Sequence, residues 1–308
     1  MILLSLPAHN GGQKILMRPG STDRGQARDV QDLHRYGFRG HIGIRFLVVT
    51  RSVSRREVLK CLSAFAPALV GLGTLAATVG APKASAAGLR LIDFAERLVQ
   101  PEQIRSAGYA GALVYVSELR PGATFDFKPV TREYADGLRA EGLHIVSCYQ
   151  FGKPGWPRSP SDFTRGYDGG VADAQTALRL HAAAGGPDSA PIFFSVDEPI
   201  DLNTWTNIAV EWFRGINSVL GVERTGIYGG NRECAWAIGD GVIGRSTTPG
   251  YRWAWQTKAW SHGEREPAAV LYQAEVVTAS DPGALIDGVH VDVDDVLAAD
   301  FGQWDLGR

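Results

Sequence analysis

From residue 89 onward, short apolar runs alternate with longer segments in which apolar residues recur at helical spacing. The short runs are rich in β-branched and aromatic residues and are bounded by Gly, Pro or polar residues, which is typical of buried strands. We predict eight strands, at residues 89–92, 111–116, 143–149, 191–196, 224–228, 252–256, 269–273 and 289–292.

Helical patterns lie between the first five of these strands. The clearest is 203–220, where Ile208, Trp212 and Ile216 recur on one face. The other helical patterns are 101–107, 131–141 and 170–184.

Strands that alternate with helices usually pair in parallel, so the chain is expected to form an α/β fold, a small (β/α)₈ barrel of the TIM type. After the sixth strand the connections are about 12 to 15 residues long without a helical period, which predicts that the last third is helix-poor. An open doubly wound sheet is the alternative, although no Gly-x-Gly-x-x-Gly loop follows the first strand.

A different pattern precedes this region. Ser54–Lys60 contains two adjacent arginines, Leu62–Gly80 is mildly apolar, and Ala84–Ala86 is a small-x-small cleavage pattern. In this order they are typical of a secretory leader, and the arginine pair indicates the twin-arginine type. A basic amphipathic helix followed by a core helix is the alternative. The apolar run is too short and too rich in Ala and Gly for a comfortable membrane span.

The chain is therefore expected to have three parts. We interpret residues 1–47, which are Gly- and Arg-rich, as a mis-assigned or disordered extension, with translation starting at a valine within 48–53. Residues 48–86 would be the signal peptide and 87–308 the barrel domain, secreted or associated with the cell envelope. The expected partners of the leader are the twin-arginine export machinery and signal peptidase, and no membrane span would persist after cleavage.

Charge divides the chain at the same place. Residues 87–308 contain 19 Lys and Arg against 29 Asp and Glu, a net charge of −10, whereas the residues before them sum to +8. An acidic domain argues against nucleic acid or an anionic membrane as the main partner. Cys148 and Cys234 are expected to be two buried thiols or a single bridge. We expect no cofactor and no metal, since no Cys–His cluster has zinc spacing.

Acidic residues follow several predicted strands, where barrel enzymes place their reactive groups. They are Asp93, Glu118, Asp197, Glu198, Asp292 and Asp294. Barrel closure would make Asp93 and Asp292 neighbours. Several carboxyl groups around one pocket suit glycoside cleavage, in which one must stay protonated and another ionised. A single acid after a strand is more often a helix cap, and we assign Asp162 and Asp201 to capping.

Aromatic and amide side chains near the same strand ends are candidates for stacking on sugar rings and bonding their hydroxyls. With Glu118, the substrate-binding candidates are Tyr149, Gln150, Trp156, Tyr228, Trp255, Tyr272 and Gln273. Core packing is the alternative for each aromatic residue.

Three segments of the chain are similar to motifs of a known family. Ile92–Phe94, Phe193–Glu198 and Val291–Asp294 resemble the first, fourth and eighth strand motifs of glycoside hydrolase family 25 lysozymes. The resemblance is closer to the actinobacterial, twin-arginine-exported "glycoside hydrolase-like" domain family, and it covers essentially all of 87–308 plus the leader. It implies a (β/α)₈ barrel, a carbohydrate-related role and placement at the cell envelope.

The fourth-strand motif departs from the lysozyme pattern. The lysozymes have Asp-x-Glu there, two acids on one face of the strand, whereas Asp197 and Glu198 are adjacent. We predict that Asp197 points into the barrel mouth, or Glu198 if the strand has already ended. The resemblance implies one of them as general acid, with Asp93 and Asp292 stabilising the positive centre.

Asp294 would be a second-rank member of this site. The expected ligand is a cell-wall glycan, peptidoglycan or a related polysaccharide. Three functions stay open at this point: a glycoside hydrolase, a non-catalytic glycan-binding or regulatory protein on the same scaffold, and a cation-dependent hydrolase.

Overall fold

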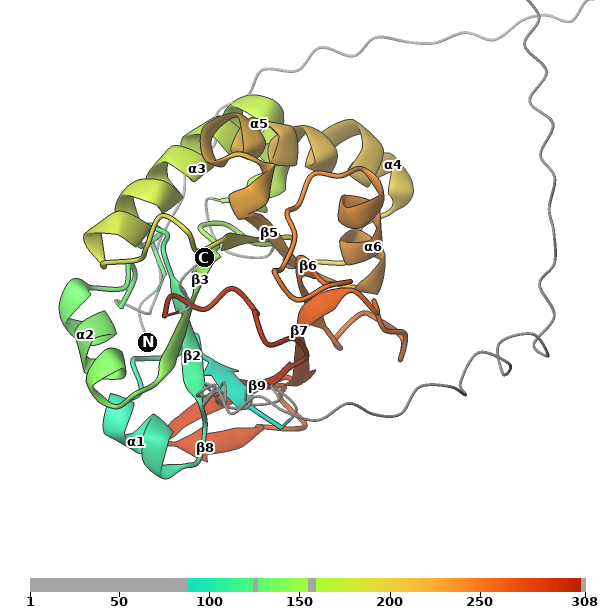
Figure 1. Ribbon diagram of the computed structural model, residues 1–308. Coiled ribbons are helices and arrows are strands. Elements are labelled where there is room, and N and C mark those ends of the chain that lie inside the picture. The colour runs from blue at the N-terminus through green and yellow to red at the C-terminus, as the bar shows by residue number, and fades with distance from the viewer. Residues whose placement is uncertain (1–87, 124–126, 155–158, 306–308) are drawn as a thin grey trace, which may run out of the picture. The chain divides into compact units, whose positions relative to one another are not determined.

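The computed structural model describes residues 88–123, 127–154 and 159–305. The expected leader and N-terminal extension therefore lie outside the described residues. One mixed sheet runs in the order β1-β2-β3-β4-β5-β6-β7-β9-β8 and closes through a β1–β9 pairing (Figure 1). Its strands are β1 (Arg90–Asp93), β2 (Gly111–Tyr115), β3 (His144–Tyr149), β4 (Ile192–Ser195), β5 (Thr225–Gly229), β6 (Arg252–Thr257), β7 (Ala269–Glu275), β8 (Ala284–Ile286) and β9 (Val289–Val296).

The predicted barrel is confirmed, and each predicted strand corresponds to a barrel strand. The orientation of the last strand differs from the expectation of an all-parallel barrel. β9 pairs antiparallel with both β1 and β7, because the short β8 hairpin partner turns the chain back on itself. Asp292 therefore reaches the mouth from the first half of its strand, not from its C-terminal end. β8 was not predicted.

The helices follow the parallel strands and leave the β7–β9 region without helices, so the helix-poor last third is confirmed (Figure 1). They are α1 (Pro101–Ser106), α2 (Arg132–Ala140), α3 (Gly166–Ala183), α4 (Leu202–Thr204), α5 (Val210–Leu220) and α6 (Asn231–Gly239). A π-helical turn, Trp205–Ala209, joins α4 to α5. Asp201 caps α4 as expected, accepting from the backbone N–H of Thr204 at 2.7 Å.

Helices α3 and α5 approach closely because each places a glycine at the contact. A Cβ on Gly170 would collide with the Trp212 carbonyl, and one on Gly215 with the Tyr167 carbonyl. Among the described residues, no helix is long and apolar enough to cross a membrane. Cys148 and Cys234 are both free and buried, which confirms the expectation of two thiols.

Two apolar clusters follow from the alternation of side chains along the strands. One lies between the barrel and its helices. The other fills the barrel interior with Leu91, Leu113, Val146, Phe193 and Trp253, and the C-terminal segment adds Phe301 to it. This interior packing leaves room for polar groups at the opposite end, where β1 to β7 finish.

Candidate active site

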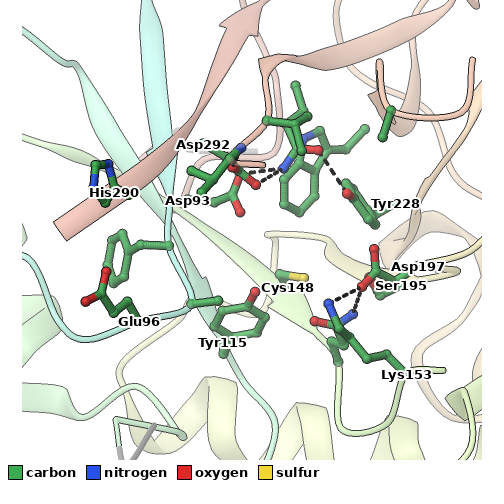
Figure 2. Close-up of a pocket in the computed structure, with 18 of the residues that line it drawn as sticks. Asp93, Glu96, Tyr115, Cys148, Lys153, Ser195, Asp197, Tyr228, His290 and Asp292 are labelled. Carbon is green, nitrogen blue, oxygen red and sulfur yellow. Dashed lines mark hydrogen bonds and ion pairs between the residues drawn. The ribbon is translucent and has the colours of Figure 1, made fainter. Parts of the chain in front are cut away.

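A pocket of about 460 Å³ opens at the end of the barrel where the parallel strands finish. Asp93, Asp197 and Asp292 line it, together with Tyr115, Cys148 and Lys153 (Figure 2). Figure 2 shows Asp93 and Asp292 together, apart from Asp197 and Lys153. The acids thus reach the pocket from two separate parts of the barrel wall.

The first group of acids is held by strand pairing. Asp93 on β1 stands opposite Asp292 on β9, as barrel closure predicted. The Gln273 amide donates from Nε2 to Asp93 Oδ2 at 2.9 Å and to Asp292 Oδ2 at 2.8 Å. Its Oε1 accepts from the Tyr228 hydroxyl at 2.9 Å, which fixes the amide orientation. The two carboxyl groups are therefore held side by side by one amide.

Asp294 lies two residues further along β9, opposite Leu91, and is fully buried beneath the pocket. Trp255 Nε1 donates to its Oδ1 at 2.6 Å. Burial raises the pKa of Asp294 to about 8 and that of Asp292 to about 6. Burial, with the charges of Asp292 and Asp294, raises the pKa of Asp93 well above its usual range. Three clustered carboxyl groups cannot all be ionised at neutral pH.

Asp197 has different surroundings. Gln150 Nε2 donates to its Oδ2 at 2.8 Å, and the Lys153 ammonium lies 3.2 Å from the same oxygen. Both contacts stabilise a carboxylate. Ser195, the last residue of β4, and Asp197 line the pocket, while Val196 between them does not.

Glu198 is not part of the pocket lining, and its assignment as an alternative acid is wrong. It follows Asp197 directly and so faces the other side of the chain, where Ser161 Oγ donates to its Oε1. Only one acid of the β4 motif therefore faces the ligand space.

Three predicted binding residues also lie elsewhere. Glu118 is on the surface in an ion pair with Arg179, because β2 has ended before it. Tyr149 points out of the barrel, buried against α3, and donates to Asp173 Oδ1 at 2.6 Å. Tyr272 is also outside the pocket lining, under the Arg265 guanidinium. Trp156 lies outside the described residues.

Gln150, Tyr228, Trp255 and Gln273 do line the pocket. Each already makes a protein hydrogen bond that orients a neighbouring group, which the sequence did not indicate. Lys153, Cys148 and Ser195 were not named as site residues. Strand periodicity would have found Cys148 and Ser195, since both lie two residues before a polar lining residue.

The loop after β3 that carries Lys153, called the Lys153 loop below, is held in place by residues outside the barrel. Asp162 accepts from the backbone N–H of Phe151 at 2.8 Å and of Gly152 at 2.9 Å, so it anchors this loop and is not a helix cap. Burial raises the pKa of Asp162 to about 7. Arg165 joins Asp162 to Asp173.

A buried lysine, Lys128, lies under the pocket wall. Lys128 Nζ stacks 3.6 Å from the centre of the Tyr115 ring and donates to the Gln150 carbonyl at 2.9 Å. Ser117 Oγ donates to the same carbonyl at 2.7 Å. Burial lowers the pKa of Lys128 to about 7. These contacts fix the end of β3 from which Gln150 reaches Asp197.

Within the described ranges, no group of three His, Cys, Asp or Glu side chains has the geometry to hold a metal ion. The pocket instead combines a proton-rich carboxyl cluster with a separate, cation-stabilised carboxylate. This combination can serve acid-assisted cleavage of a glycosidic bond or the binding of a polyhydroxylated ligand.

Barrel and site together define a glycoside hydrolase-like protein. Residues 102–296 match the family described as "Rv2525c-like, glycoside hydrolase-like domain", and the chain belongs to this family. A relative from Mycobacterium tuberculosis, described as "Putative peptidoglycan hydrolase Rv2525c", is 40% identical over 258 residues, which cover 82% of this chain and 99% of the relative.

Solved structures agree with this membership. The Tat-secreted protein Rv2525c of M. tuberculosis, crystallised with L-tartrate, superposes with a TM-score of 0.63 at 38% identity, covering 71% of this chain and 100% of that one. Export by the twin-arginine (Tat) route, which the sequence predicts for this chain, is thus a stated property of this relative. The bacterial lysozyme from Streptomyces coelicolor gives a TM-score of 0.44 at 14% identity over 68% of this chain and 92% of its own, a likeness too faint to inform function.

Proposed function

We propose that this exported protein cleaves a cell-envelope glycan, peptidoglycan or a related polysaccharide, in the pocket at the barrel mouth. The observation that carries the proposal is the presence of two unlike carboxyl environments in one pocket. Asp93 is buried and Asp292 is half-buried beside it, whereas Asp197 is held by Lys153 and Gln150. Glycoside cleavage needs one protonated and one ionised carboxyl group.

The description of the M. tuberculosis relative as a peptidoglycan hydrolase supports this substrate class. The pocket chemistry supports it as well. Carboxylate, amide and phenol groups surround the space, as expected for a ligand rich in hydroxyl and amide groups. A pocket of this volume accommodates a small number of sugar rings.

A second candidate is a non-catalytic glycan-binding protein on the same scaffold. The observation that favours it is the turned-away Glu198, which leaves β4 with one acid in the pocket. The engagement of Gln150 and Gln273 with carboxyl groups is compatible with either candidate.

The test is reducing-end release from purified peptidoglycan and, separately, from arabinogalactan by the purified protein, measured beside Asp197→Asn and Asp93→Asn. Release that both substitutions abolish supports the hydrolase. Absence of release, together with sedimentation of the protein with the same glycan and weaker sedimentation of Asp197→Asn, would replace it with the binding protein. Neither release nor sedimentation would overturn both candidates. Asp295→Asn is the matched control, since Asp295 faces away from the pocket and pairs with Arg90.

A further inference from the structure

We propose that Asp93 and Asp294 share one proton at the floor of the pocket and that Asp93 delivers this proton to the ligand. The inference rests on the proposed function for the delivery step, but the shared proton stands on the geometry of the pair alone. Asp294 would then be a positioning residue that never touches the ligand.

The contacts of Asp294 leave one of its two carboxyl oxygens without a hydrogen-bond donor. Its Oδ1 accepts from Trp255 Nε1, while its Oδ2 is buried and meets no N–H or O–H donor among the described residues. Asp294 stands two residues beyond Asp292, the strand partner of Asp93, so the Asp93 and Asp294 side chains lie on the same face of neighbouring strands, and both are buried. Two buried carboxyl groups that lie so near each other are held together only when one of them is protonated.

The position of Asp93 makes it the member that donates the proton. Asp93 lines the pocket, whereas Asp294 does not. Gln273 Nε2 already donates a hydrogen bond to Asp93 Oδ2. A proton on Asp93 can therefore point toward Asp294 or toward the pocket. Asp292 is a poorer candidate, because both of its oxygens accept N–H bonds, one from Gln273 and one from the backbone of Val277 at 2.6 Å.

The groups around the pair offer no compensating positive charge. No described Lys or Arg forms an ion pair with Asp93 or Asp294, and Arg90 instead pairs with Glu275 and Asp295 on the outer face. Lys153 and Lys258 act on Asp292 from a distance. The titratable groups that face the pair from the surrounding strands are Tyr115, Cys148, Asp197, Tyr228 and Asp292.

The chemistry balances with water as the only co-reactant. The Asp93 proton passes to the glycosidic oxygen while the bond from that oxygen to the anomeric carbon breaks, and the electron pair stays with the leaving alcohol. Asp197 stabilises the positive anomeric carbon as a carboxylate. A water molecule then adds to this carbon and loses a proton to Asp197, and solvent returns a proton from Asp197 to the Asp93–Asp294 pair.

The test needs no substrate. Purified protein labelled with ¹³C at aspartate carboxyl carbons is titrated by NMR, and the resonance that is missing from Asp93→Asn is assigned to Asp93. We expect its titration midpoint to lie well above that of an exposed aspartate and to coincide with that of the resonance missing from Asp294→Asn. In Asp294→Asn the amide donates to Asp93, so the Asp93 midpoint should fall by about one pH unit or more. Asp136→Asn, at an exposed position of α2, should leave it unchanged.

An Asp93 carboxyl group that is ionised above pH 5 in the wild-type protein, or an unchanged midpoint in Asp294→Asn, would overturn the shared proton. Should Asp294→Asn fail to fold, Trp255→Phe removes the donor to Asp294 Oδ1 and should raise the midpoint of the pair. Where glycan release occurs, the alkaline limb of the kcat/KM profile should move to lower pH in Asp294→Asn. A shared proton without glycan release would refute the proposed hydrolase and leave the pair intact.

Discussion

Asp93 on β1 and Asp292 on β9 are directly paired across two antiparallel strands, and the single amide of Gln273 donates to both carboxyl groups. This relationship joins the first and last strands of the barrel at the pocket floor. It also holds two acids side by side with little exposure to solvent, which raises the pKa of both. Asp197, across the pocket, has a lysine instead.

The two adjacent acids after β4 should differ sharply in their importance. Asp197→Asn removes the charge that faces the ligand, and we expect glycan release to fall by about 10²-fold or more. Glu198→Gln should change release by less than about threefold, because Glu198 lies outside the pocket lining against Ser161. Release assays at one glycan concentration, with thermal melts to verify folding, measure both. Equal losses in the two variants would contradict this placement.

Asp292 should make stability depend on pH. Its pKa rises from an ordinary unfolded value near 4 to about 6 in the folded protein, so folding takes up a proton between these values. The resulting contribution to stability is full below pH 4 and is lost as the pH rises through 6. Asp292→Asn should flatten this part of the stability curve by up to about 2 kcal/mol.

Urea unfolding at pH 4.5 and 7.5 measures the Asp292 effect as a difference between wild type and variant, in which the other titrating groups cancel. Asp295→Asn, on the same strand but half-exposed, is the control. A wild-type protein and an Asp292→Asn variant with parallel pH curves would refute the predicted proton uptake.

Two tyrosines should separate packing from ligand contact. The Tyr149 hydroxyl donates to Asp173 outside the barrel, so Tyr149→Phe should cost about 1 kcal/mol of stability and leave glycan binding unchanged. The Tyr115 side chain lines the pocket, and its hydroxyl has no hydrogen-bond partner among the described residues. Tyr115→Phe should therefore weaken glycan sedimentation with little change in stability. The reverse pattern would show that Tyr149 is the contact residue.

The Lys153 loop should depend on Asp162, which accepts two backbone N–H bonds at its start. Asp162→Ala leaves these donors without their acceptor and should cost about 1–3 kcal/mol of stability. It should also weaken glycan binding, because Lys153 would no longer be held beside Asp197. Lys153→Met provides the comparison, with weaker binding at nearly unchanged stability. Full binding by folded Asp162→Ala would argue that the loop is positioned by other contacts.

The barrel and its helix-poor last third followed from the sequence, because each strand is a continuous apolar run and side-chain alternation is a local property. The same alternation predicts that Asp197 faces the barrel mouth. Helix α6 and strand β8 were missed. The helical segment Asn231–Gly239 contains the buried Glu233, and two glycines directly precede it. Its apolar period is therefore weak.

Sequence alone thus determined the order of the strands and the motifs that end them, since these are properties of neighbouring residues. Barrel closure also predicted that Asp93 and Asp292 would be neighbours, but only the tertiary structure decided which other polar groups meet them. The antiparallel course of β9 put Asp294 beneath the pair. Tyr149 lies on the outward side of β3 and contacts Asp173, and Lys153 lies in the loop after β3 and contacts Asp197. Contacts between residues far apart in the chain depend on closure and strand direction, which no local pattern records.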